Sequence, residues 1–459
     1  MFNLNFLFGH FQETIKLGFP IIIARTSILL MVTVDAMMTG WAGSDELAYL
    51  GIGLAPGLTL MIISIGALQA TVVLSSQAVG SNNIQQIGGV WRVSLLHSII
   101  FSIIAIICTL YVEQLFLITG QDAVVSEEGA KVAMVFAFGI PGMLLFVSTN
   151  LILESLGYPK VAMCIMLAAN GLNIILNGIF VLSWGNYFNL GGAYEAVLVS
   201  SSIRWAVFLA AFIYLIWMSN KNKNKYNIIV PLNMWIKQLI SINDPITKKF
   251  RKISLPMSFT QAVESVAFGV MVFIAGLFGT NALAAHQACF TIMSLVYMLA
   301  IGMAGATSIR VGKAVGMQNV KNTQVSGFVG LIVAAFLTLP FTFFAVFYPE
   351  TIARIFFIDI EIINLTAQVL IIIGCLAVFD GMMAVTLGAL RGTGDVWMPC
   401  VMQSIAFWLI GLPIAYYLSV NLEYGIIGLW YGLGSGIFIS LLLLVPRFYM
   451  ISSKPIVRL

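Results

Sequence analysis

Three acidic residues lie deep inside long apolar stretches of the sequence, where charged side chains are rare. They are Asp35, Glu264 and Asp380. A charged side chain near the centre of a lipid bilayer costs roughly 2.5–3.5 kcal/mol on insertion scales, so its retention indicates a function. A carboxylate removed from water binds a proton, a sodium ion or an organic cation, and each of these neutralises it. These ligands therefore compete for one group, and that competition is the chemistry of exchanging one cation for another.

Amide side chains accompany these acids in the sequence. Gln261 precedes Glu264 by three residues, so both lie on one face of a helix. Asn173 and Asn177 are four residues apart and likewise share a helix face. Because hard cations prefer oxygen ligands, two acids with nearby amides favour a sodium ion, held by Glu264 and Asp380, over a proton. The proton stays as the alternative.

The composition is that of a membrane protein. Of 459 residues, 60% are hydrophobic and only 9% are charged, against roughly 25% charged residues in soluble domains. A soluble enzyme, a nucleic-acid binder and a disordered chain are thereby excluded. The five cysteines are scattered singly without a CxxC pair, and no G-x-x-x-x-G-K-[ST] phosphate loop occurs. We expect no disulfide framework, no zinc site, no bound nucleotide and no cofactor beyond a coupling cation.

Twelve apolar stretches are long enough to cross a bilayer as helices, for which about 20 residues suffice. The first contains Arg25 and Asp35 in its interior and is too long for a cleaved signal sequence. The predicted spans are 14–40, 46–78, 93–111, 132–154, 162–183, 194–217, 254–278, 285–308, 325–347, 365–388, 398–419 and 426–446.

The basic residues indicate an orientation for these spans. With both termini in the cytoplasm, the outer segments hold only Lys131 and Arg354. The remaining lysines and arginines lie in cytoplasmic segments, apart from Arg25 and Arg204 inside spans. This asymmetry follows the positive-inside rule. Arg25 stands nearly three turns before Asp35, too far for direct pairing along the helix, so we expect it to pair with another helix or to reach the cytoplasmic interface.

The two halves of the sequence resemble each other at a displacement of about 235 residues. IKLGFP near the start of the sequence returns as RKISLP before the seventh span, and ATVVLSSQAVGSNN at 70–83 returns as ATSIRVGKAVGMQN at 306–319. Six spans per repeat make the repeats parallel, an arrangement found in transporters whose site lies between two halves. We therefore expect an all-α membrane protein of twelve transmembrane helices in two pseudo-symmetric six-helix lobes, at 1–217 and 254–459.

The segment 218–253 between the sixth and seventh spans is the longest polar stretch. It contains NKNKNKY and then a mixed stretch at 233–250, for which a short surface helix is expected. Its lysines predict a solvated cytoplasmic linker that is attracted to anionic lipid head groups.

Four motifs carry a family resemblance. DAMMTGWAG begins at Asp35, NALAAHQ ends at Gln287, SIRVGKAVG occupies 308–316, and FDGMMAVTLGALRGTGD covers 379–395. In their order and spacing they resemble the multidrug and toxic compound extrusion (MATE) family over nearly the full length, and within it the NorM-like bacterial branch. The resemblance implies a two-lobed bundle around a central cleft, in a bacterial inner membrane with both termini cytoplasmic.

The resemblance also carries over to individual residues. Asp35, Glu264 and Asp380 match the family's functional acids, and the last two look like its cation-coupling pair. Asn173 and Asn177 fall on its span-five asparagine motif. The residues that the resemblance predicts for substrate binding are Asp35, Gln261, Asn173, Asn177 and Gln287.

Two positions depart from the family pattern. Leu376, one turn before Asp380, stands where relatives often place a tyrosine, so a different ion shell is expected. Glu195 stands where relatives usually have a small residue.

The function implied by the resemblance is a secondary active exporter, not an enzyme. It would antiport small amphipathic organic cations against inward Na+, or H+, by alternating access. Its expected partners are these cations and the lipid bilayer, without nucleic acid or nucleotide. With no motif for oligomerisation, a monomer is expected.

Three other functions fit the sequence less well than the exporter. A flippase for lipid-linked oligosaccharides shares the two-lobed superfamily, but such flippases usually carry several cationic residues in the cavity, whereas the embedded charges here are mainly acidic. An intramembrane aspartyl protease would explain GTGD at 392–395, but the Tyr-Asp dipeptide of such proteases is absent. A passive channel has less use for duplicated halves with paired acids.

Overall fold

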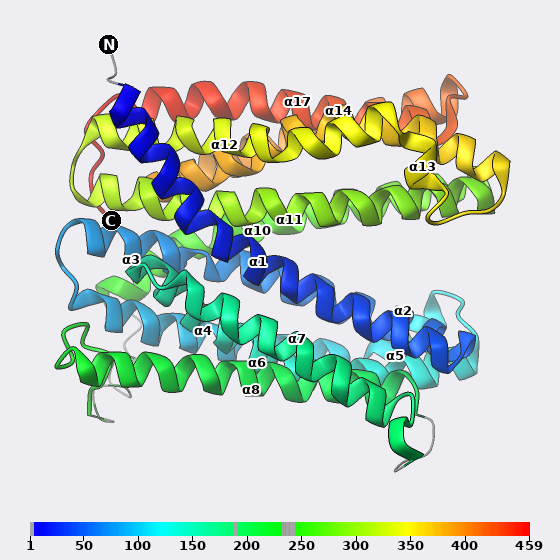
Figure 1. Cartoon of the computed structure of the whole chain (residues 1–459), viewed down its shortest axis with the longest axis horizontal. Helices are drawn as coiled ribbons and strands as arrows, with labels where there is room; N and C mark the ends of the chain where they lie inside the picture. The colour runs from blue at the N-terminus through cyan, green and yellow to red at the C-terminus, as the bar shows by residue number, and fades with distance from the viewer. Residues whose placement is uncertain (1–3, 187–190, 232, 234, 236–237, 239–243) are drawn as a thin grey trace. The chain divides into compact units, whose positions relative to one another are not determined.

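The computed structural model describes residues 4–186, 191–231, 233, 235, 238 and 244–459 (Figure 1). The described part is helical and contains no strand. Twelve helical segments in it are long and apolar enough to cross a membrane, by length and composition. Each overlaps one predicted span, which confirms the prediction of an all-α protein with twelve transmembrane helices.

The helices extend beyond the predicted apolar ranges because polar residues continue them at their ends. The first repeat contains α1 (Leu4–Ala42), α2 (Ser44–Leu68), α3 (Ala70–Gly80), α4 (Gln86–Thr109), α5 (Val112–Ile118), α6 (Ala123–Leu156), α7 (Pro159–Phe180), the 3-10 turn η1 (Trp184–Asn186) and α8 (Ala193–Lys221). The second repeat contains α10 (Pro245–Gly276), α11 (Thr280–Gly316), α12 (Val320–Phe347), α13 (Pro349–Ala353), α14 (Ile360–Thr393), α15 (Trp397–Ser404), the π-helical η2 (Ile405–Gly411), α16 (Leu412–Tyr416), the π-helical η3 (Tyr417–Asn421) and α17 (Gly425–Ser452). Two spans are composite: α2 continues into α3, and the segment from α15 to η3 forms one span.

Packing divides the chain into two compact units. The N-terminal unit consists of Ile23–Ser258, and the C-terminal unit consists of Phe259–Leu459 together with Met1–Ile22. The predicted lobes, 1–217 and 254–459, kept each repeat intact and left the linker separate. In the structure, the first turns of α1 pack with the second repeat, while the first turns of α10 and the described residues of the linker group with the first repeat.

The internal repeat is visible in the positions at which equivalent helices begin and end. Helix α2 begins at Ser44, and its equivalent α11 begins at Thr280. Asn82 and Gln318, which follow α3 and α11 in the left-handed conformation, are separated by the same length of chain as Ser44 and Thr280. The two repeats therefore keep one register through their second span.

In the fourth span, equivalent residues of the two repeats are one residue further apart along the chain than in the second span. Helices α6 and α14 are capped by Asp122 and Asp359, whose carboxylates accept a hydrogen bond from the backbone N–H two residues later. They end before Gly157 and Gly394, both left-handed. Asp122 and Asp359 are separated by the same number of residues as Gly157 and Gly394. Each residue of α6 is therefore paired with the residue of α14 that lies at this spacing along the chain.

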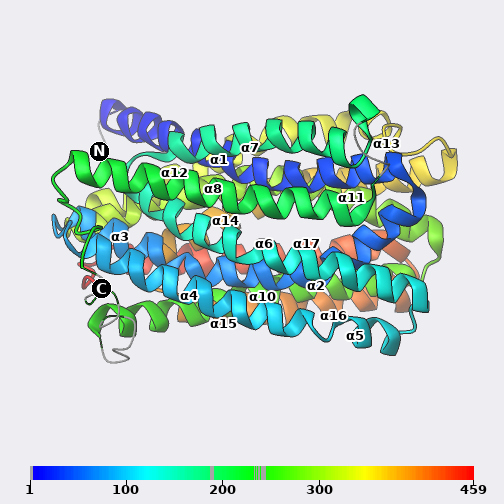
Figure 2. The same cartoon turned by 90° about the horizontal axis from the view of Figure 1, so that it is seen from below.

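These two equivalent helices lie at the centre of their own units. Helix α6 packs against α2, α4 and α8, and α14 packs against α11, α12 and α17 (Figures 1 and 2). Close approach requires small residues: a Cβ added at Gly142 would lie 2.8 Å from the backbone N of Trp205 on α8, and one at Gly392 would lie 2.7 Å from the carbonyl of Ser308 on α11.

Buried hydroxyls join α3, α4 and α6 of the N-terminal unit. The Ser94 hydroxyl contacts Thr71 at 2.7 Å and donates to Ser148 at 2.8 Å, and Ser98 contacts Ser148 at 2.6 Å. Such hydrogen bonds between membrane helices add stability where hydrophobic burial does not distinguish helix from lipid. They make this helix cluster a rigid support for the polar residues nearby.

The prediction for the linker is tested only in part. Helix α8 ends at Lys221, and the following residues form turns up to Tyr226. Within the stretch 233–250, predicted as a surface helix, most of the residues from 233 to 243 lie outside the described residues. From Pro245 the chain is already part of α10.

Candidate functional site

Asp35 is held in the N-terminal unit by two amides of α7. Its carboxylate Oδ1 accepts hydrogen bonds from the Nδ2 of Asn173 at 2.9 Å and of Asn177 at 2.7 Å. Asn170, one turn earlier on the same face of α7, donates to the carbonyl of Ser27 at 3.0 Å. The i, i+3, i+7 spacing of the three asparagines thus aligns α7 along α1. Asp35 and the three asparagines are all buried.

The two amides that hold Asp35 leave acceptors unused. The Oδ1 atoms of Asn173 and Asn177 are buried and accept no hydrogen bond from any described residue. Buried polar atoms without partners are uncommon and call for a ligand, an ion or a water. Together with the Asp35 carboxylate they form a group of oxygen acceptors that suits a cation. The structure thus brings together three of the residues predicted for substrate binding.

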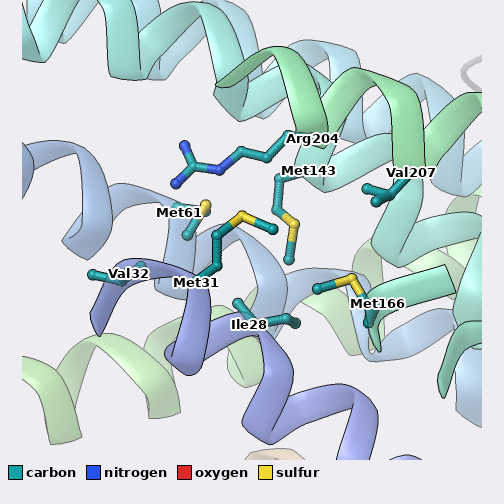
Figure 3. A pocket seen from close by; sticks show the side chains of 8 residues that line it. All are labelled: Ile28, Met31, Val32, Met61, Met143, Met166, Arg204 and Val207. Atoms are coloured by element: carbon teal, nitrogen blue, oxygen red, sulfur yellow. The ribbon is translucent and has the colours of Figure 1, made fainter. Parts of the chain in front are cut away.

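Arg204 on α8 carries a positive charge within electrostatic range of Asp35. It interacts electrostatically with Asp35 without forming an ion pair. Instead its guanidinium lies 4.2 Å from the ring centre of Phe136, and it lines a small pocket beside Met31 and Met61 (Figure 3). Asp35 therefore has no ion-pair partner among the described residues.

Arg25, on the same helix as Asp35, has a partner of its own. Its Nη2 lies 3.3 Å from both carboxylate oxygens of Glu154 on α6, and Asn150 donates to the same carboxylate at 2.6 Å. Arg25 and Glu154 are 7% and 1% exposed, so this is a buried ion pair. The prediction that Arg25 pairs with another helix is confirmed. Glu154 was missed because it ends a predicted span.

Glu264 and Asp380 form the second acidic group, in the C-terminal unit. Both are 6% exposed and lie close enough to interact electrostatically. The hydroxyl of Tyr297 on α11 donates to Glu264 Oε1 at 2.8 Å. Neither acid forms an ion pair with a described residue, although Arg391 on α14 lies within electrostatic range of Glu264. Two adjacent buried carboxylates with one hydroxyl offer the oxygen ligands that hard cations prefer.

Tyr297 was not predicted from the sequence. Leu376 stands where relatives often place a tyrosine, so we expected an ion shell without a tyrosine at that position. The structure supplies a tyrosine from a different helix. The only sequence signal was a hydroxyl-bearing aromatic residue in the middle of the span, which by itself does not reveal which face it occupies.

The two predicted glutamines are placed differently. Gln261 is partly buried on α10, one turn before Glu264, as expected from their spacing. Gln287 is exposed on α11, and its side chain makes no hydrogen bond to a described residue. Of the two, only Gln261 lies beside the acidic group.

Glu195 stabilises the beginning of α8. Its carboxylate accepts a hydrogen bond from the backbone N–H of Gly192 at 2.7 Å, and Glu46 accepts one from Ala193 at 2.7 Å. Negative charge at a helix N-terminus satisfies otherwise unpaired N–H groups and interacts favourably with the helix dipole. The acid at this unusual position therefore caps a helix.

Comparison with known proteins places this arrangement in a family. The MatE family model matches residues 20–179 and 256–417, two segments that begin one repeat apart. The chain is 28% identical over 446 residues, with 96% of each chain covered, to the probable multidrug resistance protein NorM of Bacillus anthracis. It is 27% identical over 454 residues to the multidrug resistance protein MdtK of Photorhabdus laumondii, covering 97% of this chain and 96% of that protein. The crystal structure of the eukaryotic MATE transporter AtDTX14 superposes with a TM-score of 0.88 over 98% of both chains, at 17% identity.

Two parallel six-helix repeats, each with buried acidic groups, are an arrangement typical of transporters. The chain belongs to the MatE family. It is accordingly a multi-pass membrane transporter rather than an enzyme, and the relatives named above from Bacillus and Photorhabdus are bacterial.

Proposed function

We propose that this transporter is a multidrug exporter that antiports amphipathic organic cations against inward Na+, with H+ as the alternative coupling ion. The observation that carries the proposal is the presence of two separate buried acidic groups, one in each unit, that make no ion pair with a described residue. A buried charge without a partner is costly. It is retained when a mobile cation supplies the missing partner.

In this proposal the C-terminal group binds the coupling ion. Glu264, Asp380 and the hydroxyl of Tyr297 provide oxygen ligands for Na+. The electric potential contributes roughly 2.3 kcal/mol per entering charge per 100 mV. Inward movement of one or two cations is then enough to drive cargo outward without a nucleotide.

The N-terminal group binds the cargo. The Asp35 carboxylate and the unused amide oxygens of Asn173 and Asn177 attract a positively charged group. Gln261 lies one turn before Glu264 on α10, so we assign it to ion binding in the C-terminal unit. The names of the bacterial relatives, multidrug resistance proteins, support a broad cargo range.

The excess of lysine and arginine in alternate connecting segments supports a location in the inner membrane with both termini cytoplasmic. Because no further partner is needed for either acidic group, we propose a monomer as the working unit.

The proposal is tested by ethidium transport in proteoliposomes that contain the purified full-length protein. An inward Na+ gradient at equal pH and clamped potential is expected to accelerate ethidium export by roughly tenfold, as expected for coupling to one or two ions. A pH gradient without Na+ should have little effect. Ethidium movement that responds to neither gradient would refute cation-coupled export, and a response to pH alone would select H+.

Tyr297 offers a finer test of the ion group. Since a hydrogen bond to a charged group contributes about 1.5–3 kcal/mol, Tyr297→Phe is expected to raise the Na+ concentration for half-maximal export by roughly tenfold. Tyr416→Phe, an exposed tyrosine of α16, is the matched control. An unchanged Na+ dependence in Tyr297→Phe would remove the hydroxyl from the proposed ion shell.

A further inference from the structure

A pocket in the C-terminal unit lies between the start of α1, the end of α11 and the start of α12. Its volume of about 320 Å³ falls at the lower end of the range of small-ligand sites, about 300–1,000 Å³. None of the residues of the two acidic groups lines it. We call it the basic pocket, and its polar lining consists of His10, Glu13, Arg310, Lys313, Asn322 and Ser326.

Three side chains of the basic pocket have unused hydrogen-bonding groups. Lys313 is partly buried, and its ammonium forms no ion pair or hydrogen bond with a residue that the structure describes. The side-chain amide of Asn322 and the hydroxyl of Ser326 likewise have no partner there, and Ser326 is only 3% exposed. Asn322 and Ser326 are one turn apart on α12, so both lie on one helix face. Buried polar groups without partners indicate a ligand or an ordered water.

The basic pocket has an excess of positive charge. Arg310 is 9% exposed, its Nη1 donates to the carbonyl of His10 at 2.8 Å, and its Nη2 lies 3.1 Å from Glu13. These contacts hold the guanidinium against α1. Glu13 is the one acid that lines the pocket among the described residues, and its side chain is 72% exposed, so water weakens its attraction. Arg310 and Lys313 thus leave the pocket with a net positive charge.

Helix α12 adds to the attraction for an anion. It is 28 residues long, and its N-cap Asn319 accepts a hydrogen bond at 3.0 Å from the backbone N–H of Asn322, whose side chain lines the pocket. The N-terminus of a helix carries a partial positive charge and binds anions such as phosphate. Lys313, Asn322 and Ser326 supply donors in addition to this charge. The basic pocket therefore suits a phosphate group.

The first repeat lacks both cations of the basic pocket. In the register of the second span, Arg310 corresponds to Leu74 and Lys313 to Gln77. An apolar and a neutral side chain thus stand where α11 carries a guanidinium and an ammonium. The positive charge belongs to the second repeat alone, so it is not a consequence of the shared fold.

The equivalent place in the N-terminal unit is closed by its own chain. The start of α10, which corresponds to the start of α1, packs Ile246 so closely against Gly89 of α4 that an added Cβ would lie 2.7 Å from the isoleucine. The backbone N–H of Gly88 donates to the carbonyl of Tyr226 at 2.9 Å, and Gln238 donates to the carbonyl of Gly89 at 3.2 Å. The linker thus covers the start of α4, whereas at the start of α12 the space is left as the basic pocket.

The position of the basic pocket favours a lipid over a soluble anion. Lys313 and Asn322 lie within one turn of the ends of the membrane-spanning helices α11 and α12, on the side that the proposed orientation places in the cytoplasm. Further along α1 and α12, the apolar side chains of Phe19, Ile332 and Phe336 are exposed, as expected for contact with acyl chains. Basic pockets between membrane helices on the cytoplasmic side bind the head groups of anionic lipids.

We propose that the basic pocket binds the phosphate group of an anionic phospholipid, such as phosphatidylglycerol, in the cytoplasmic leaflet. Lys313 pairs with the phosphate, and Asn322 and Ser326 donate hydrogen bonds to its oxygens. Arg310 contributes charge while it holds α1. Phosphatidylcholine carries the same phosphate, but its choline cation is repelled by Arg310 and Lys313. The bound lipid joins α1 to α11 and α12 within the C-terminal unit, and the inference does not depend on which cation drives export.

Lipid binding to the purified full-length protein tests the proposal. The delipidated protein is titrated in detergent with dioctanoyl phosphatidylglycerol or dioctanoyl phosphatidylcholine, and native mass spectrometry measures the affinity for the first bound lipid. Lys313→Gln removes the charge and Lys313→Arg keeps it, while Lys225→Gln removes an exposed lysine from the linker in the other unit. A photoactivatable phosphatidylglycerol, followed by peptide mass spectrometry, identifies the helices in contact with the lipid. Thermal unfolding of each variant reports folding.

Wild type is expected to bind phosphatidylglycerol roughly tenfold more tightly than phosphatidylcholine. Lys313→Gln should weaken phosphatidylglycerol binding by roughly tenfold, the effect of a lost hydrogen bond to a charged group. Lys313→Arg should stay within about threefold of wild type, and Lys225→Gln should be unchanged. Crosslinks are expected at the start of α1, the end of α11 and the start of α12. If Lys313→Gln does not fold, the selectivity of wild type and its crosslinks decide the question.

Three results would overturn the proposal. The first is equal affinity of wild type for the two lipids. The second is an equal loss in Lys313→Gln and Lys225→Gln, which would indicate diffuse attraction to basic residues. The third is displacement of phosphatidylglycerol by inorganic phosphate or glycerol 3-phosphate at the concentration of the lipid itself, which would assign the basic pocket to a soluble phosphate. Ethidium export is measured separately, so a failed lipid site leaves the proposed exporter function standing.

Discussion

Replacing Glu264 by Gln together with Asp380 by Asn is expected to abolish gradient-driven export of ethidium, with the rate falling by roughly 100-fold toward that of protein-free liposomes. Both changes preserve side-chain shape and remove charge. A neutral amide offers a carbonyl oxygen but no net attraction for Na+, so the coupling ion loses both of its charged ligands. Each single variant should lose less, because one acid and the Tyr297 hydroxyl remain.

The measurement is initial export rate in proteoliposomes at fixed protein content, with Na+ concentration varied. Glu361→Gln, an exposed acid in the first turn of α14, provides the control for loss of negative charge in the same unit. The double variant should still bind ethidium, since Asp35 lies in the other unit. Full export by the double variant would show that the driving ion binds elsewhere.

The largest effect on stability is expected at the buried pair of Arg25 and Glu154. Removing one partner of a buried ion pair costs about 3–5 kcal/mol because the other charge stays behind without compensation. Arg25→Met should therefore strongly destabilise the N-terminal unit, leaving Glu154 with only the amide of Asn150. The double variant Arg25→Met/Glu154→Leu should recover most of that loss, since apolar side chains of similar volume replace the pair.

Denaturant unfolding of the detergent-purified protein, followed by tryptophan fluorescence, measures these differences. Lys131→Met, which breaks an exposed contact with Glu128, is the control and should change stability by less than about 1 kcal/mol. A double variant as unstable as Arg25→Met alone would mean that the pair does not act as a unit. The comparison separates a structural role of Arg25 from a role in binding.

The sequence was sufficient for the spans, the repeat and the acidic residues, because each depends on hydrophobicity or local spacing. The shared face of Asn173 and Asn177 also follows a local pattern, since residues one turn apart lie on one side of a helix, but their contact with Asp35 on another helix does not. The sequence could not predict how one helix is rotated relative to its neighbour. Tyr297 and Glu154 became visible only when α11 and α6 were placed beside α10 and α1.

The role of Arg204 likewise could not be predicted from the sequence. An arginine in a span can pair, reach the interface or bind a ligand, and only the structure shows that Arg204 is buried and that no described residue accepts a hydrogen bond from its Nη1. The repeat register also needed the structure, because its lengthening in the fourth span shows in the aspartate caps and left-handed glycines rather than in residue identity. That single-residue shift is what aligns Asp380 with Met143.

The first turns of α1 and of α10 each pack with the other repeat rather than with their own, and this arrangement bears on how the chain arose. Residues up to Ile22 pack with the second repeat, and the start of α10 up to Ser258 packs with the first. An ancestor with a single repeat would have formed this arrangement as a pair of copies that swapped their first turns, as in domain-swapped dimers. Neither half, produced alone, contains all the surfaces against which its own helices fold.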